Sequence, residues 1–404
     1  MPRKLLVLTR YYYPAGSGAE LATKIIVEEI LAQLYDEILV LTGEPRGEHR
    51  PHPRVLVRST PVLRGSKPAI LAKTMRSLDK LLELIKHYDT VYVPSNALLF
   101  VPGMIRGRYR GRIIVHLHDY QAVSYTSVIF HNTSPGPWTD YLVETRDYNR
   151  RLRALLVTGL QPLQRLYNKG YCAADVAITV SNRQRQLINK YSPCKPGEEK
   201  TIYNPLPPRL RNPKPITRAS RGPEKPLLLY IGGARLTKGY PIVLRTLTLL
   251  ERQSSKDIEL LLAKIPSTEW KKVSMIAKAK DIEVHAYPQI PRETLFKTYE
   301  ERRPILLHPS LHEEPLPYTV IEAAILGAKP LASRLGGVPE ILANTPAHKY
   351  LHSPGDAQQL AKQVEEALGQ DPIIAAEEAI ETREKLLERL QIDNVREEIE
   401  KIFL

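Results

Sequence analysis

Short apolar runs alternate with longer stretches of helical periodicity along almost the whole chain. Strands are predicted where several apolar residues follow one another, and helices where apolar residues recur every three or four positions. The predicted strands cover residues 4–9, 37–41, 55–57, 90–93, 113–115, 176–180, 227–233, 259–263, 283–286, 305–307 and 329–332. Strands that alternate with helices in this way favour open, mostly parallel α/β sheets.

A proline-rich stretch divides this pattern into two series. Seven prolines lie in residues 205–226, and such a composition is typical of a linker between domains. A length of 404 residues also suits two or three domains. We therefore predict a first α/β domain over 1–204 and a second over 227–384. The last segment is helical and acidic, and a final helix at about 385–404 is expected to pack back on the first domain.

The net charge of +14 is concentrated in the first half of the chain. Residues 1–210 carry 30 Lys and Arg against 17 Asp and Glu, a net charge of +13, and the remainder carries +1. A basic domain indicates an anionic partner, such as nucleic acid, an anionic membrane surface or a phosphorylated acceptor. The alternative is charge that serves solubility alone. Nucleic acid is the least favoured partner, because the chain has no basic–aromatic recognition motif.

Apolar residues recur at helical spacing from about 69 to 86, among several lysines and arginines. This pattern predicts an amphipathic basic helix, which packs on a sheet or lies on an anionic membrane. We favour packing, because Asp79 and Glu83 interrupt the basic face.

The cellular setting follows from what the chain contains. The first apolar run is too short for a secretion signal, and no run approaches the ~18 apolar residues that a membrane span needs. Cys172 and Cys194 are the only cysteines, too few for a disulfide framework or a cysteine-based zinc site, and we expect a reducing compartment. The predicted location is cytoplasmic, with possible peripheral attachment to the inner membrane face.

Two candidate ligand loops follow strands of the first domain. Gly16 and Gly18 lie between the first strand and the first helix, where a backbone can approach a phosphate. The loop fits neither the dinucleotide fingerprint nor a Walker loop, and an ordinary strand–helix turn is the alternative. His118 and Asp119 follow the strand at 113–115, on the side where ligands bind in such sheets. A metal site or a structural histidine are the alternatives for His118.

The second domain places cations and carboxylates after its strands. Arg235 and Lys238 follow a Gly-Gly turn and form a natural cation pair for a diphosphate. Glu314 precedes the helix predicted for 318–326, and Glu322 lies within it. Glu314 can accept hydrogen bonds from sugar hydroxyls, and Glu322 could hold a ribose diol. The alternative is a pair of solvated acids near a helix start, although apolar neighbours of Glu322 argue against full exposure.

Taken together, these motifs resemble the GT-B glycosyltransferases, specifically the retaining GT4 family, also called glycosyl transferases group 1. The resemblance covers nearly the whole chain. It rests on Gly18-Ala19-Glu20, His118-Asp119, Asp175, Ser181, Asn204, Arg235 with Lys238-Gly239, Pro309-Ser310, the pair Glu314 and Glu322, and Gly336-Gly337-x-Pro-Glu340. It implies two Rossmann-like, doubly wound domains that face each other across a cleft.

The resemblance also implies roles for individual residues. Arg235 and Lys238 would hold the donor diphosphate, and Gly18 would bring backbone close to it. Glu322 would bind the ribose. Glu314 and His118 are the expected catalytic residues, with Glu314 on the sugar hydroxyls and His118 beside the sugar and the acceptor. A donor-sugar or phosphate loop is expected at Gly16, Pro315, Leu316, Pro317 and Tyr318.

We accordingly expect a retaining transferase that moves a hexose from a nucleotide-diphosphate sugar to a lipid-linked, saccharide or other anionic acceptor. No cofactor and no metal are expected, and the chain has no Asp-x-Asp motif. Two departures from the family leave the sugar and the base open. Pro315 and Pro317 stand where glycines are usual, and Lys264 follows a strand where a glycine turn is usual. The alternatives are a GT-B sugar-nucleotide epimerase and a basic nucleic-acid-binding α/β protein.

Overall fold

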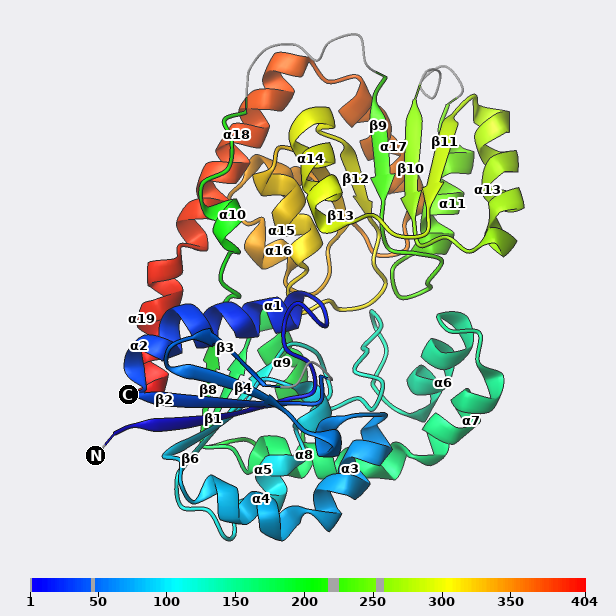
Figure 1. Ribbon diagram of the computed structural model, residues 1–404. Helices are drawn as coiled ribbons and strands as arrows, with labels where there is room; N and C mark the ends of the chain where they lie inside the picture. The colour runs from blue at the N-terminus through cyan, green and yellow to red at the C-terminus, as the bar shows by residue number, and fades with distance from the viewer. Residues whose placement is uncertain (1, 45–47, 217–224, 252–257) are drawn as a thin grey trace.

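Two parallel sheets, each covered by helices on both faces, lie one above the other in the computed structural model (Figure 1). The structure describes residues 2–44, 48–216, 225–251 and 258–404. The fold class is confirmed: the chain forms two Rossmann-like α/β units. Part of the predicted linker, residues 217–224, lies outside the described residues.

The first sheet has eight strands in the order β3-β4-β2-β1-β5-β6-β7-β8. All of its pairs are parallel except β3 with β4. Its strands are β1 (Lys4–Thr9), β2 (Glu37–Thr42), β3 (His49–His52), β4 (Val55–Ser59), β5 (Thr90–Val93), β6 (Arg112–Leu117), β7 (Val176–Thr179) and β8 (Glu198–Thr201). The short edge strands β3 and β8 lack an apolar run and were not among the predicted strands.

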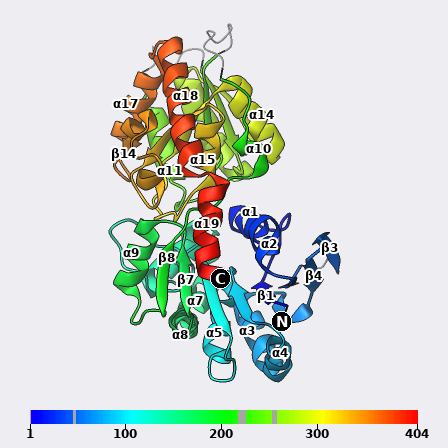
Figure 2. The same ribbon diagram turned by 90° about the vertical axis from the view of Figure 1, so that its left-hand side faces the viewer.

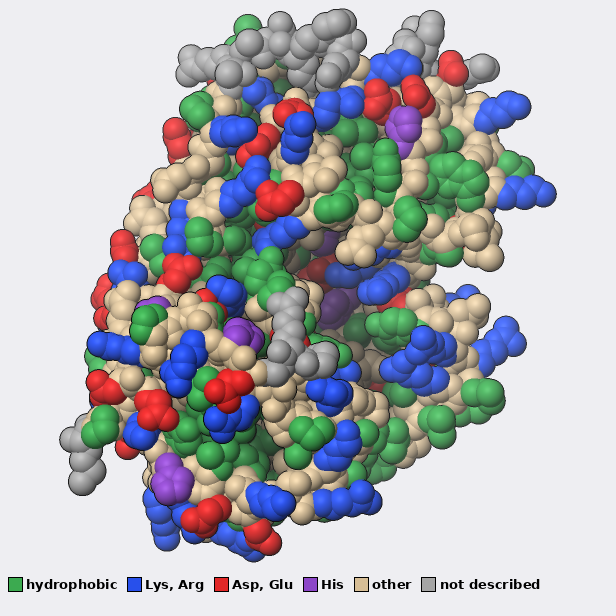
Figure 3. Space-filling view, viewed as in Figure 1, with side chains coloured by type: hydrophobic (Ala, Val, Ile, Leu, Met, Phe, Trp, Pro, Cys, Tyr) green, Lys and Arg blue, Asp and Glu red, His purple; other side chains and the backbone are tan. Residues whose placement is uncertain are grey.

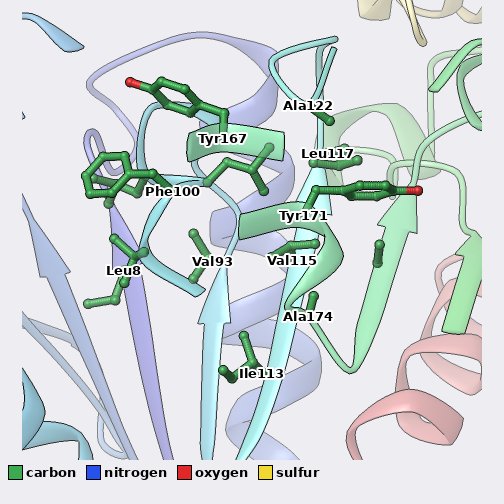
Figure 4. Close-up of a cluster of buried hydrophobic side chains, with 14 of the residues drawn as sticks. Leu8, Val93, Phe100, Ile113, Val115, Leu117, Ala122, Tyr167, Tyr171 and Ala174 are labelled. Carbon is green, nitrogen blue, oxygen red and sulfur yellow. The ribbon is translucent and has the colours of Figure 1, made fainter. Parts of the chain in front are cut away.

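Helices cover both faces of this sheet because its central strands are apolar on both sides. The helices of the first domain are α1 (Gly18–Ile25), which continues through a π-helical turn (Ile26–Leu31) into α2 (Ala32–Leu34), then α3 (Lys67–Arg76), α4 (Leu78–Ile85), α5 (Val101–Ile105), α6 (Pro137–Arg146), α7 (Arg151–Gly159), α8 (Gln164–Cys172) and α9 (Asn182–Tyr191). Figure 4 shows Val93 and Val115 of the sheet packed beneath Phe100, Tyr167 and Tyr171.

The second sheet has six parallel strands in the order β11-β10-β9-β12-β13-β14. The strands are β9 (Leu227–Tyr230), β10 (Glu259–Ala263), β11 (Glu283–Tyr287), β12 (Ile305–His308), β13 (Lys329–Ser333) and β14 (Leu351–His352). The helices are α10 (Pro208–Arg211), α11 (Tyr240–Leu249), α13 (Ser267–Lys280), α14 (Arg292–Arg302), α15 (Tyr318–Ile325), α16 (Val338–Ile341), α17 (Ala357–Leu368) and α18 (Pro372–Arg389).

The last helix, α19 (Ile392–Phe403), lies against the first domain, whereas α18 lies against the second (Figure 2). Phe403 meets the rings of Tyr35 and Tyr92 edge to face, at centroid distances of 6.4 and 5.3 Å. The side chain of Arg3 donates to the carbonyl oxygen of Phe403 at 2.7 Å. The return to the first domain therefore begins after α18, a few residues later than the boundary of about 385 that we predicted.

The basic helix predicted over 69–86 is two helices, α3 and α4, which meet at Ser77. Ile70 and Leu82 from these helices are buried in the core of the first domain. The packing interpretation is therefore confirmed for this segment.

The two cysteines are paired: Cys172 and Cys194 form a disulfide, with their Cα atoms 5.8 Å apart. It ties the end of α8 to the loop after α9, two segments that lie close together only in the folded chain. The small number of cysteines therefore no longer argues for a reducing compartment. None of the helices in the described part of the chain has the length and apolar character that crossing a bilayer requires.

Candidate active site

A cavity of about 520 Å³ lies between the two domains. It opens at the carboxyl ends of β1 and β6 on one side and of β9 and β12 on the other. In each sheet the strand order reverses at the first strand, β1 or β9, and open α/β sheets bind ligands at such switch points. Figure 3 shows the hollow between the domains, with histidine and acidic side chains inside it.

The first domain contributes the start of α1 to this cavity. Ser17, Gly18 and Ala19 line it, and the backbone N–H of Ser17 donates to Oε2 of Glu20 at 2.7 Å. A Cβ atom at Gly18 would lie 2.6 Å from the ring of Tyr318 in the second domain. Glycine at position 18 therefore allows the two domains to approach each other at this point.

His118 lies at the carboxyl end of β6 and also lines the cavity. Its ring stacks on His116 at a centroid distance of 4.3 Å, and burial lowers the pKa of His118 to about 4. Both ring nitrogens of His118 are without a hydrogen-bond partner among the described residues, as is Oδ1 of the buried Asn204 across the same cavity. Unpartnered buried polar atoms are costly, so these side chains indicate a polar ligand.

Metal binding is the alternative interpretation of the His-x-His-Asp motif. Nδ1 of His116 is hydrogen-bonded to the hydroxyl of Tyr92 at 2.8 Å. Within the described residues, no group of three or more His, Cys, Asp or Glu side chains is placed to hold a metal ion.

The second domain contributes the carboxylate and the cations. Nζ of Lys238 lies 2.8 Å from Oε2 of Glu314, and Nε2 of His308 lies 3.2 Å from Oε1. Burial raises the pKa of Glu314, but Lys238 and His308 outweigh it and hold the pKa well below its usual value. Glu314 is therefore ionised at neutral pH, inside a cavity that Arg235 also lines.

The two adjacent acids of this loop have different surroundings. Glu313 points away from the cavity lining and binds the guanidinium of Arg183 in the first domain, at 2.5 and 3.1 Å. It also accepts a hydrogen bond from the backbone N–H of Gly336 at 2.8 Å. Gly336 has a φ of +57°, and a Cβ there would lie 1.9 Å from the carbonyl oxygen of Glu314. The glycine loop thus fixes the backbone that directs Glu314 into the cavity.

Glu322 and Gly16 do not line the cavity, whereas Pro315, Leu316, Pro317 and Tyr318 do. The buried carboxylate of Glu322 is paired with Arg292 of α14, and burial raises the pKa of Glu322 to about 7. It lies one helical turn beyond Tyr318, whose hydroxyl donates to the carbonyl oxygen of Pro205 at 2.7 Å. The predicted set is therefore gathered around one cavity except for Glu322 and Gly16, which lie next to its walls.

Lys264 is a lining residue that the sequence analysis did not propose for the site. It follows β10 and has a φ of +63°, a conformation that glycine adopts without strain and other residues rarely adopt. The signal in the sequence was that a lysine stands where the resemblance described above leads us to expect a glycine turn. The lysine retains the glycine conformation and adds a third cation to the same wall as Arg235 and Lys238.

The insert between β6 and α7 reaches across to the second domain. The backbone N–H of Glu313 donates to the carbonyl oxygen of Ile129 at 2.9 Å, and that of His131 donates to Leu311 at 3.1 Å. Asp147 accepts from the backbone N–H of Thr237 at 3.1 Å, within the loop that carries Arg235 and Lys238. The insert therefore braces both loops that hold the charged residues.

A second cavity of about 170 Å³ adjoins the first on the side of the first domain and shares Asp119 with it. Arg10 and Lys67 line it. Burial lowers the pKa of Lys67 to about 8, although Asp119 opposes this effect. The second cavity is therefore a polar compartment beside the site between the domains, with two cations, of which Lys67 donates to the carbonyl oxygen of Tyr125 at 2.8 Å.

The comparisons with known proteins agree with this architecture. Residues 214–387 match the family model described as "Glycosyl transferases group 1". A search of curated protein sequences finds no match.

Similar solved structures span nearly the whole chain at low sequence identity. Sucrose-phosphate synthase from Thermosynechococcus elongatus is 17% identical, with a TM-score of 0.70 and coverage of 99% of this chain and 98% of that one. HepE from Anabaena, in complex with UDP and glucose, is 17% identical, with a TM-score of 0.64 and coverage of 99% of each chain. The trehalose-6-phosphate synthase OtsA is 13% identical, with a TM-score of 0.68 and coverage of 98% of each chain. Residues 214–387, which include most of the second domain, thus match the glycosyl transferases group 1 model, and the whole chain has the GT-B fold of these solved structures.

Proposed function

We propose that this chain is a retaining, GT4-type transferase that moves a hexose from a nucleotide-diphosphate sugar to an anionic acceptor. The observation that carries the proposal is the cavity between the domains. It brings Arg235, Lys238 and the ionised Glu314 of one domain against His118 and Gly18 of the other. Two of the similar structures support a nucleotide-sugar donor, since HepE is described with UDP-glucose and an E. coli relative with UDP-2-fluoro glucose.

The donor diphosphate is proposed to bind at the wall formed by Arg235 and Lys238. Both cations lie near the start of α11, and the backbone of Gly18 faces them across the cavity. Positive charge at this wall stabilises the negative charge that develops on the leaving diphosphate. The proposed mechanism gives no part to a divalent metal or a cofactor, because side-chain cations supply the charge.

The sugar is proposed to lie between Glu314 and His118. An ionised carboxylate accepts hydrogen bonds from sugar hydroxyls. A neutral imidazole with free nitrogens can position a hydroxyl of the sugar or the acceptor. The acceptor oxygen bonds to the anomeric carbon on the face from which the diphosphate leaves, and a donor phosphate oxygen takes the acceptor proton. The products are the glycosylated acceptor and the nucleoside diphosphate.

Glu322 stays the proposed ribose-binding residue. Its carboxylate is paired with Arg292 in this structure, so binding of a ribose diol requires exchange of that partner. Pro315 and Pro317 line the sugar end of the cavity and have no N–H to donate. Sugar hydroxyls on that side therefore depend on the remaining backbone N–H groups and on Glu314.

The acceptor is proposed to enter through the second cavity. Arg10 and Lys67 line this cavity, and Nε of Arg10 is buried without a hydrogen-bond partner among the described residues. Two cations beside the reaction centre suit a phosphorylated or otherwise anionic acceptor, whether a saccharide or the head group of a lipid.

Single substitutions at the donor wall test the function. Lys238→Ala and Glu314→Ala should each lower donor turnover by roughly 10²–10³-fold while the circular dichroism spectrum stays that of the wild type. Lys278→Ala, an exposed lysine of α13, is the matched control and should leave turnover unchanged. Normal turnover in both site variants would show that the chemistry lies elsewhere.

Two further measurements define the reaction. Thermal shifts across UDP-, GDP- and ADP-sugars identify the donor. The anomeric configuration of the product, read by NMR, distinguishes retention from inversion. Conversion of the donor to its epimer without any acceptor would establish the epimerase alternative instead.

A further inference from the structure

The helices α6 and α7 form a hairpin beside the mouth of the cleft, apart from the sheet (Figure 1). In α7 the buried residues are Ala154 and Val157. The opposite face carries Leu152, Leu155 and Leu156, which are 81%, 65% and 68% exposed. These three leucines have the spacing of a single helix face.

This apolar face lacks a partner within the described part of the chain. Trp138 of α6 is also 69% exposed and adds to the apolar surface of the hairpin. Elsewhere Met75 and Met275 are exposed singly, and Ile373 and Ile374 form an adjacent pair. Because burial of a leucine side chain is favourable by about 1.5–3 kcal/mol, a contiguous set of this kind indicates a docking surface.

The charge around the leucines identifies the occupant. Exposed arginines lie on and next to these helices, namely Arg146, Arg150, Arg151, Arg153 and Arg165, of which Arg153 is paired with Glu144 at 3.1 Å. Asp140, Glu144 and Asp147, the acids of residues 137–171, are buried or half-buried. Figure 3 shows basic and hydrophobic side chains together on the lobe where Figure 1 labels α6 and α7. A second copy of this surface would meet it with like charge, whereas an anionic bilayer offers phosphates to the arginines and an apolar layer to the leucines.

The hairpin is also connected to the donor-binding loop. Between its two helices, Asp147 accepts from the backbone N–H of Thr237 at 3.1 Å. The guanidinium of Arg235 lies over the ring of Tyr148 at 5.5 Å. A partner bound to the outer face of α7 would therefore lie next to the open side of the cleft.

We propose that the outer face of the α6–α7 hairpin docks on a bilayer that contains anionic lipid. This proposal rests on the proposed function: docking of the hairpin would bring the second cavity to the head group of a lipid-linked acceptor. The leucines and Trp138 enter the boundary between head groups and acyl chains, and the arginines contact lipid phosphates.

Vesicle co-sedimentation of the full chain tests the proposal. The wild type should sediment with vesicles of phosphatidylcholine and phosphatidylglycerol, and much less with phosphatidylcholine alone. L152Q/L155Q should lower binding to the anionic vesicles by roughly tenfold or more. R150Q/R151Q should lower it by roughly 30-fold at low salt, because each arginine contributes about fivefold. Met275→Gln, which changes an exposed methionine of α13 in the second domain, is the matched control and should bind like the wild type.

Binding of UDP and hydrolysis of the donor, measured without vesicles, separate this proposal from the proposed function. Both should be unchanged in the leucine and arginine variants. Equal sedimentation of the wild type and L152Q/L155Q, or equal binding to neutral and anionic vesicles, would overturn the docking proposal while leaving the enzyme assignment intact. Light scattering that shows a wild-type dimer lost in L152Q/L155Q would also overturn it, since the face would then hold a second copy.

Discussion

The first turn of α9 is capped by a carboxylate from the other domain. Glu340 of the second domain accepts hydrogen bonds from the backbone N–H groups of Asn182 and Arg183, at 2.9 and 2.5 Å. The hydroxyl of Ser181 accepts from the N–H of Gln184 at 3.2 Å. The first N–H groups of a helix have no partners within the helix, so Glu340 completes the cap of α9 only while the domains stay together.

Glu340→Ala removes this cap. A hydrogen bond to a charged acceptor contributes about 1.5–3 kcal/mol, and because this carboxylate is partly exposed each of the two bonds contributes about 1 kcal/mol, or about 2 kcal/mol together. A negative charge at a helix N-terminus adds about 0.3–1 kcal/mol. The total is about 3 kcal/mol, or roughly 100-fold in the opening equilibrium of this turn. Glu340→Gln keeps a neutral acceptor and should lose roughly half of that free energy.

Amide hydrogen exchange of a peptide that contains residues 182–185 measures this opening directly. Exchange should be roughly 100-fold faster in Glu340→Ala than in the wild type, with Glu340→Gln between them. The control is Asp371→Ala, since Asp371 caps α18 through the N–H groups of Ile373 and Ile374 within its own domain. It should speed exchange in α18 and leave α9 unchanged. Wild-type exchange of α9 in Glu340→Ala would show that the cap does not hold the helix across the domain boundary.

Two further predictions concern residues of the cavity. Lys264→Gly should raise the free energy of unfolding, measured by urea titration, by about 0.5–1 kcal/mol. Glycine removes the cost of a positive φ in the folded chain, and the greater conformational entropy of glycine in the unfolded chain cancels only part of that gain. Lys264→Ala should not raise the free energy of unfolding, and both variants should bind UDP more weakly than the wild type at low salt. The wild type should lose stability as the pH falls from about 6.5 to about 4, because burial lowers the pKa of His118 to about 4 and the unfolded chain takes up the proton first. In His118→Gln the midpoint of urea unfolding should fall less over this pH range, and an equal fall would contradict a buried neutral imidazole.

The two sheets could be predicted because apolar runs mark buried parallel strands. Runs such as 4–9 and 259–263 predicted β1 and β10 at their observed bounds. The edge strand β8 has the sequence Glu-Glu-Lys-Thr and pairs on one side only, so no hydrophobic pattern marks it. The break between α3 and α4 at Ser77 could not be predicted either, because the helical spacing of apolar residues continues across it.

The charged wall of the cavity in the second domain could be predicted from the sequence because its residues follow strands of one sheet. The carboxyl ends of β9 and β12 are adjacent, so side chains in the loops that follow them meet. Arg235, Lys238 and Glu314 are such residues. Glu322 and its partner Arg292 come from neighbouring helices, and helix-to-helix pairing cannot be read from a strand pattern.

The adjacent acids Glu313 and Glu314 show where sequence reasoning ends and why. One residue of spacing sends their side chains to opposite sides of an extended loop, so only one of them can face the ligand. Nothing in the sequence states which, because the choice depends on Arg183, a residue far away in the chain that binds Glu313 from the first domain. The same helix α9 is held at its first turn by Glu340. The identity of the carboxylate in the cavity is thus a property of the assembled pair of domains, because contacts between the domains also select the residue that faces the cavity.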